Sequence, residues 1–316
     1  MTKKFKDTSI TNIIVKTIIF VVLLLFAISY IAILVWGFLT TLKSKASFEF
    51  DGNVFGFPSI LEPEFYQLKN YKIMLENLDL VVKDSFYNAG KLVSVNIKVP
   101  FYMSIYNSIV YALGTAVLST FVTCIVAYVC SKFKNYVFSS IIYMVNLFVM
   151  VTPIVGSSGV LMELLRKFGL YDTLTGIIIP GITFTGMYFL VFYAMLSDLP
   201  NSYSEAAEID GAGRLRIMFS IIIPLVSKTI STVILLKFIA TWQDYNTALL
   251  FLPSHPTVAY VIWYYTVGGG RSIKPELGSV PIQISSCMIL ALPIIVLFIF
   301  ARDKIMGNVS IGGIKE

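Results

Sequence analysis

Six apolar runs, each long enough to cross a membrane, decide what this chain can fold into. They cover about 14–38, 105–130, 138–160, 174–197, 226–251 and 283–301. A transmembrane helix needs about 20 mostly apolar residues to span the hydrocarbon core. Because 57% of the 316 residues are hydrophobic, an ordinary soluble domain is excluded. We therefore predict an all-α polytopic membrane protein with six transmembrane helices.

Lysines and arginines beside the runs predict how the chain is oriented. Those next to the termini and in short loops all fall on one side of the six predicted spans: Lys3, Lys4, Lys6, Lys16, Lys132, Lys134, Arg214, Arg216, Lys228, Arg302, Lys304 and Lys315. Short basic loops stay in the cytoplasm. Both termini are therefore expected in the cytoplasm, and the protein in the cytoplasmic membrane among its lipids. The net charge of +6 comes from these clusters, which argues against a nucleic-acid-binding face.

This orientation divides the chain into four predicted parts. Residues 1–38 hold the cytoplasmic N-terminus and an uncleaved first span, and 39–104 form an extracellular loop. Residues 105–301 carry the other five spans, and 302–316 form a cytoplasmic tail. The extracellular loop is rich in turn formers and aromatic residues, and no helical or strand period in it is strong enough to predict a domain.

A polar segment at 200–224, PNSYSEAAEIDGAGRLRIMFSIIIP, separates the fourth and fifth runs. Ser202 and Glu205 have the spacing of a capping box, which predicts the start of a helix. Gly211 predicts its end, because glycine tolerates a positive φ. Arg214 to Phe219 predict a second short helix, and Pro224 can begin the next one. The residues alone favour an ordinary helical loop on the surface of a membrane protein.

The spacing within this segment resembles the signature loop of bacterial ABC-importer permeases. The family pattern is EAA, three residues, G, nine residues, I, one residue and LP, and here only the Leu is changed, to Ile223. The resemblance implies a cytoplasmic coupling helix, between the fourth and fifth spans, that docks into a cleft on an ATPase subunit. Its implied coupling residues are Glu205, Ala206, Ala207, Asp210, Gly211, Ile221 and Pro224.

Further segments resemble the carbohydrate-uptake type of these permeases, of which the maltose-type small permease is an example. They are Asn70-Tyr71, Asn107-Ser108, Trp242 to Asn246, Pro256 to Tyr260 and the Gly-Gly tail, so that the resemblance covers roughly 65–316. It implies a heterodimer with a second permease, two ATP-binding cassette subunits and an extracellular solute-binding lipoprotein. ATP and Mg would bind to the partner ATPase, and this chain would bind no cofactor.

Six residues are candidates for the substrate path, on different grounds. Asn146 lies in a run interrupted by Pro153 and Gly156, and Lys237 is an ionisable residue deep in the fifth run. Trp242, Gln243, Asp244 and Asn246 combine an aromatic ring with groups that can accept sugar hydroxyls. The alternatives are a simple helix end near Pro153, a Lys237 side chain that extends toward the cytoplasm, and an interfacial aromatic belt.

A ridge of small residues recurs every four positions in the second run: Thr115, Ser119, Thr123, Ala127 and Ser131. Such a ridge allows helices to approach closely, either inside this chain or at a subunit seam. The sequence leaves both possibilities open.

Motifs for catalysis are missing from the sequence. It has no G-x-x-x-x-G-K-[ST] phosphate loop, one histidine, His255, and three cysteines, Cys124, Cys130 and Cys287, in or beside apolar runs. No metal site and no hydrolysis by this chain are expected. The alternatives are an ABC-importer permease for another solute and a secondary transporter, although the latter would need repeated halves.

Overall fold

The computed structural model describes residues 10–61, 65, 68–88, 91–152 and 156–306. Pro153, the lysines before Ile10 and the tail after Met306 therefore lie outside the described residues. The chain forms two compact units, one from residues up to 77 together with 269–289, the other from 78–268 together with 290–316.

The first unit is a long helix followed by short turns. Its elements are α1 (Ile10–Thr41), the π-helical turn η1 (Ala46–Phe50), α3 (Lys69–Asn77), the 3₁₀ turns η3 (Gly269–Ser272) and η4 (Pro275–Gly278), and the start of α15 (Val280–Met306).

Buried side chains fasten the end of α1 to α3 and to the turns after it. Asn70 Nδ2 donates to the carbonyls of Thr41 and Lys43 at 2.7 and 2.8 Å. The Lys43 ammonium donates to the carbonyls of Asn53 and Val54, and burial lowers its pKa. Asn70, from the Asn-Tyr segment noted in the sequence, thus gives hydrogen-bond partners to carbonyls at the end of a long helix that have none within the helix.

The second unit holds most of the helices. Its elements are β1 (Leu80–Asn88), β2 (Lys91–Val99), α4 (Phe101–Lys132), α5 (Val137–Val151), α6 (Ser157–Lys167), α7 (Leu174–Gly181), α8 (Met187–Asp198), α9 (Ser202–Ile209), α10 (Arg214–Ile217), the π-helical turn η2 (Met218–Ile222), α11 (Ile223–Leu225), α12 (Ser227–Trp242), α13 (Tyr245–Phe251), α14 (Val258–Thr266) and the rest of α15.

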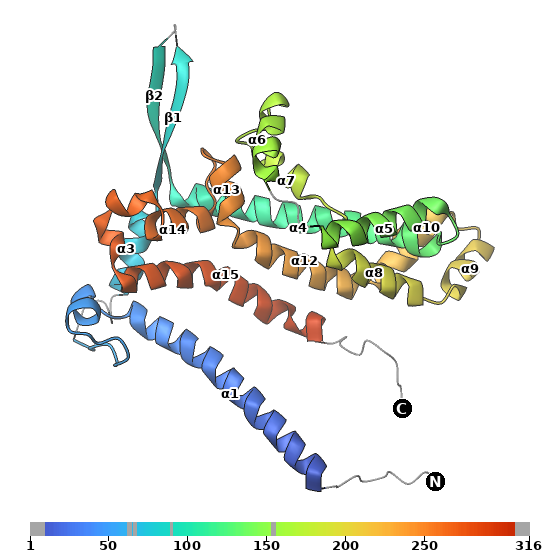
Figure 1. Ribbon diagram of the computed structural model, residues 1–316, viewed down its shortest axis with the longest axis horizontal. Helices are drawn as coiled ribbons and strands as arrows, with labels where there is room; N and C mark the ends of the chain where they lie inside the picture. The colour runs from blue at the N-terminus through green and yellow to red at the C-terminus, as the bar shows by residue number, and fades with distance from the viewer. Residues whose placement is uncertain (1–9, 62–64, 66–67, 89–90, 153–155, 307–316) are drawn as a thin grey trace. The chain divides into compact units, whose positions relative to one another are not determined.

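The long helix α4 forms the axis of this unit, with α8 and α12 alongside it (Figure 1). The five residues of the small-residue ridge are all buried. Since they are buried within this chain, the ridge packs helices of the same bundle, and the subunit seam is not needed to explain it.

Three of the six predicted spans are divided in the structure. The run 138–160 is split into α5 and α6, the run 174–197 into α7 and α8, and the run 226–251 into α12 and α13. Where α7 ends and α8 begins, the backbone N–H of Gly186 donates to Asn146 Oδ1 at 2.6 Å. Irregular backbone at membrane depth requires such partners, because lipid offers none.

Length and composition single out three described helices as able to cross a membrane: Asn12–Thr41, Phe101–Lys132 and Val280–Phe300. A fourth span is obtained if Arg214–Leu225 and Ser227–Trp242, which meet at a bend of 73°, are counted together. The prediction of a polytopic helical protein is confirmed at this level, and the count of six spans stays a prediction.

A two-stranded hairpin departs from the all-α prediction. β1 and β2 pair antiparallel from Leu80↔Val99 to Asn88↔Lys91, within the loop 39–104, where no strand was expected. The segment is rich in β-branched and aromatic residues, which fit a pleated strand better than a helix. The fold is therefore mostly helical, with one hairpin.

We predict that Asn146→Ala destabilises the protein by about 1–3 kcal/mol, because it leaves the Gly186 N–H buried without its acceptor. Thermal unfolding in detergent measures the effect. Met150→Leu is the matched control, because it removes only the weak sulfur partner of the same Asn146 side chain, at 3.7 Å. Equal unfolding temperatures for Asn146→Ala and the wild type would contradict the structural role of this bond.

Candidate functional site

The signature loop folds as the sequence predicts, into a short helix, a turn and a second short helix. α9 is followed by Gly211 in the left-handed region, with φ of +79°. Its last turn closes through bonds from the Asp210, Gly211 and Ala212 N–H groups to the carbonyls of Ala206, Glu208 and Ala207. The predicted positive φ at Gly211 is thus confirmed, and only glycine adopts it without strain.

The start of α9 differs from the predicted capping box. Ser202 lies inside the helix, Asn201 is the N-cap, and no side chain caps the helix. The Asn201 side chain instead accepts a hydrogen bond from Lys132 Nζ at 3.1 Å, so it is committed to the end of α4. The first turn is closed by the backbone alone, from Ser204 and Glu205 N–H to the Asn201 carbonyl.

One face of α9 is fixed to the helical core and the other is free. Ala207 is 7% exposed and belongs to a cluster with Leu196, Ile217 and Val226. Glu205 and Ala206, by contrast, are exposed. The paired alanines thus have different roles: Ala207 allows close packing, while Ala206 keeps the outer face narrow.

Two large apolar side chains in the loop were not singled out from the sequence. Ile209 is 86% exposed and Leu215 is 71% exposed, although both lie in a polar, charged segment. Exposed apolar groups next to polar ones are typical of a protein-binding surface. Counting hydrophobic residues inside 200–224 would have flagged them.

The loop joins the membrane helices through a sharp bend. After α10 come η2 and α11, and this segment meets α12 at 73°. Ile221 is half-buried and Ile222 buried, while Pro224 is exposed in the first turn of α11. The bend falls at Val226, shortly after the π-helical turn and Pro224, and both features are recognised causes of helix kinks.

Lys237 joins α12 to α4 in the interior of the helical unit. Its ammonium donates to Ser119 Oγ at 2.7 Å and to Thr123 Oγ1 at 3.4 Å. Ser119 Oγ in turn donates to the Thr183 carbonyl at 3.0 Å, which lies in the break between α7 and α8. The ammonium of Lys237 is thus bound to hydroxyl groups of α4, and its direction relative to the membrane stays a prediction.

The other candidates for the substrate path occupy different environments. Trp242 is buried and donates from Nε1 to the Leu290 carbonyl at 3.0 Å. Asp244 Oδ1 accepts from the Asn246 and Thr247 N–H groups and so caps α13, while Oδ2 accepts from the Tyr111 hydroxyl. Gln243 and Asn246 are exposed, and Asn146 holds the α7–α8 break. The structure does not bring these residues into one cluster with Lys237.

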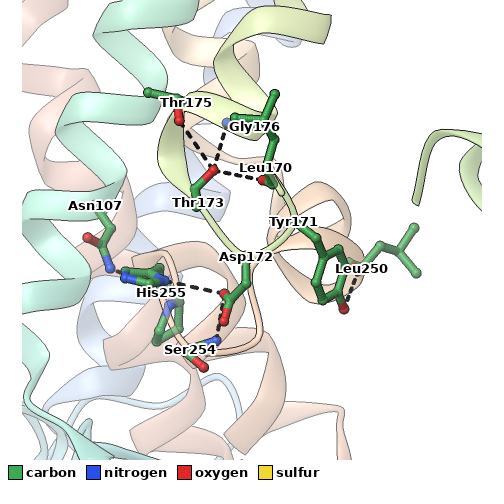
Figure 2. Close-up of polar contacts among 11 residues, drawn as sticks. Asn107, Leu170, Tyr171, Asp172, Thr173, Thr175, Gly176, Leu250, Ser254 and His255 are labelled. Atoms are coloured by element: carbon green, nitrogen blue, oxygen red, sulfur yellow. Dashed lines mark hydrogen bonds and ion pairs between the residues drawn. The ribbon is translucent and has the colours of Figure 1, made fainter. Parts of the chain in front are cut away.

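A polar clamp fastens the loop after α13 to the turn before α7 (Figure 2). Asp172, with φ of +61°, accepts on Oδ1 from the Ser254 N–H at 3.0 Å and lies 3.3 Å from His255 Nδ1. Asn107 Nδ2 donates to the Pro256 carbonyl, and Ser108 Oγ accepts from the Val258 N–H. The Asn107-Ser108 pair noted in the sequence therefore anchors the start of α14.

Comparison with known proteins shows the family to which this chain belongs. The family model of the inner membrane component of binding-protein-dependent transport systems matches residues 119–310, and the chain belongs to this family. A maltodextrin transport permease of Bacillus subtilis is 30% identical over 217 residues, which cover 66% of this chain and 74% of that protein. An arabinooligosaccharide transport permease of the same species is 26% identical over 211 residues, covering 66% and 72%.

A solved structure has the same fold. It is a bacterial ABC transporter involved in the import of the acidic polysaccharide alginate, and one of its chains aligns with a TM-score of 0.68 and 21% identity. The alignment covers 96% of this chain and 99% of that chain.

We predict that Asp244→Ala destabilises α13 by about 0.5–2 kcal/mol, whereas Asp244→Asn keeps most of the stability, because asparagine caps a helix as well as aspartate. Thermal unfolding of both variants in detergent tests this. If Asn and Ala are equally damaging, the charge of Asp244 matters more than its cap, and a role in binding becomes the better explanation.

Proposed function

We propose that this chain is one of two permease subunits of an ABC importer that takes up a sugar or oligosaccharide. The observation that carries the proposal is the arrangement of α9, whose Ala207 side packs on the helical core while Glu205, Ala206 and Ile209 face outward. A helix held on one side and free on the other can bind a second protein and pass its motion on to the spans.

The partner for this outer face is a cytoplasmic ATPase subunit. Two such subunits would bind ATP and Mg and supply the hydrolysis, and a second, different permease would complete the path. The loop offers a carboxylate, a narrow alanine surface and the exposed Ile209 and Leu215, a combination that suits a groove with an apolar floor and a polar rim.

A saccharide as substrate is supported by the relatives, which are named for maltodextrin and arabinooligosaccharides. An extracellular solute-binding lipoprotein would deliver it. An importer for another solute is the nearest alternative. Identifying the solute that the lipoprotein binds separates the two.

Transport in this proposal is alternating access driven from the cytoplasm. Closure of the ATPase pair draws the coupling loops together, and the bend between α11 and α12 carries the displacement into α12. Because Ala207 and Ile217 pack with Leu196 of α8, α8 and α12 would move as connected bodies. Six spans with both termini in the cytoplasm are part of this proposal.

Gly211→Val should uncouple the transporter. Valine at a positive φ costs about 1–3 kcal/mol, and no neighbouring atom lies within 4 Å of the added Cβ, so the effect comes from the backbone alone. We expect uptake and substrate-stimulated ATP hydrolysis in reconstituted vesicles to fall, while the subunit still reaches the membrane. Gly213→Val is the matched control, because Gly213 has an ordinary φ of −69°.

Glu205→Lys should act on binding instead. It places a cation at the start of α9, where negative charge is favoured, and on the face offered to the ATPase, so pull-down of the ATPase should weaken. Ile223→Leu, which restores the family's residue, should change little. Full assembly, stimulation and uptake by both Gly211→Val and Glu205→Lys would show that this loop does not couple.

The topology is tested with single cysteines after Cys124, Cys130 and Cys287 are replaced by serine. Phe55→Cys should react with an impermeant thiol reagent on intact cells, because the loop 39–104 is expected outside. Ile209→Cys should react only after permeabilisation. Both wild-type side chains are more than four-fifths exposed in this chain, at 88% and 86%, so in cells that lack the ATPase subunit access is limited by the membrane alone. Labelling of Ile209→Cys from outside would overturn the orientation and the coupling role together.

A further inference from the structure

A cavity with several polar side chains among its lining opens within the helical unit at the break between α7 and α8. Its volume is about 510 Å³, inside the range of about 300–1,000 Å³ typical of small-molecule sites. Hydroxyl groups, a lysine and an aromatic ring line it: Thr115, Ser119, Thr183, Thr185, Tyr188, Lys237 and Thr241. None of these residues belongs to the coupling loop.

The charge of Lys237 is not neutralised at this site. Its two hydrogen-bond partners, Ser119 and Thr123, are neutral hydroxyls, and across the described ranges of the chain no carboxylate forms an ion pair with it. An ammonium has three N–H donors, so a donor and a full positive charge remain for a ligand. The Tyr188 ring centroid lies 5.5 Å from Nζ, within the distance of a cation–π interaction.

Thr115 gives a second, independent sign of a ligand. It is 8% exposed and lines the same cavity, yet its Oγ1 has no hydrogen-bond partner among the residues that the structure describes. Buried hydroxyls are normally hydrogen-bonded. Thr115 and Lys237 line the same cavity, and a polar molecule there can complete the bonding of both once the buried Thr115 hydroxyl turns toward it.

The depth of Lys237 argues against lipid as the occupant of the cavity. Lys237 follows Ser227, the first residue of α12, by ten residues, which is about 15 Å along a helix and half of the roughly 30 Å hydrocarbon core. Thr183 and Met187, at the mouth, are exposed. An ammonium at this depth is expected to face a water-filled space rather than acyl chains.

We propose that this cavity is a subsite for a saccharide carrying an anionic group, a carboxylate, sulfate or phosphate, with Lys237 binding the anion and Thr115 a sugar hydroxyl. The proposal rests on the proposed importer function and makes it more specific. Lys237 would then select acidic over neutral saccharides. The Tyr188 ring, at the same wall, offers an apolar face for the sugar's C–H groups.

The test uses the complete transporter, with its partner permease, ATPases and binding protein, in vesicles. The probes are uronate trisaccharides of several stereochemistries, their sulfated counterparts and their carboxyl-reduced neutral twins. The wild type should show ATP hydrolysis and uptake that an acidic probe stimulates and that its neutral twin stimulates much less.

Lys237→Met, which keeps the length of the side chain, should lower uptake of the acidic probe roughly tenfold or more and leave the neutral twin's small uptake unchanged. Lys237→Arg should retain the preference.

Two further variants separate binding from structure. Thr115→Val should weaken uptake of the acidic probe several-fold without lowering thermal stability, because its hydroxyl has no protein partner to lose. Lys228→Met, on the exposed part of the same helix, should leave the ratio of acidic to neutral uptake unchanged.

The outcomes that overturn the subsite differ from those that overturn the importer. A wild type stimulated by neutral saccharides and not by acidic ones, or a Lys237→Met variant that loses both equally, contradicts the anion subsite and leaves the importer function intact. A complete transporter that no saccharide stimulates contradicts the importer function on which the subsite rests.

Discussion

The hydrogen bonds at the gap between α7 and α8 are the constraint on which the irregular part of the helical unit depends. There the chain leaves its helix inside an apolar run, and lipid offers no partners to the freed backbone groups. The Gly186 N–H is bound by Asn146 of α5, and the Thr183 carbonyl accepts from Ser119 and Thr123 of α4. Because Lys237 of α12 donates to the same Ser119, these bonds tie α4, α5 and α12 to the gap between α7 and α8.

The helices joined by these bonds carry both candidate sites, the coupling loop and the Lys237 cavity. On one side of the bundle, Ala207 of α9 and Ile217 of α10 rest on the core, in one cluster with Leu196 at the end of α8. Further along, α8 begins at Met187, in the wall of the Lys237 cavity. In the proposed mechanism, a displacement of α9 is carried along α8 and α12 to the cavity by packed side chains. In that mechanism the bend of 73° before α12 sets the direction in which the loop pushes.

Local signals made the loop predictable, whereas contacts between distant segments could not be predicted from the sequence. The helix, the turn at Gly211 and the second helix follow from residues that act on their own backbone, and the small-residue ridge follows from its four-residue spacing. Lys237 and Ser119, by contrast, are 118 residues apart, so only the fold could show that the ammonium points inward. The hairpin was missed although Val93-Ser94-Val95-Asn96-Ile97-Lys98-Val99 alternates with a period of two. The capping box failed because the helix begins one residue early: Asn201 already has helical φ and ψ of −64° and −22°, so Ser202 lies inside the helix.

The central claim is that α9 presents its outer face to an ATPase in the cytoplasm. A photo-cross-linking amino acid at Ile209, in the assembled and active transporter, tests it most directly. The same group at Phe168, which is 71% exposed and lies in a loop expected outside the membrane, is the control. We predict an adduct with the ATPase subunit from Ile209 and none from Phe168. Absence of an ATPase adduct from Ile209, or its presence from Phe168, would contradict the account.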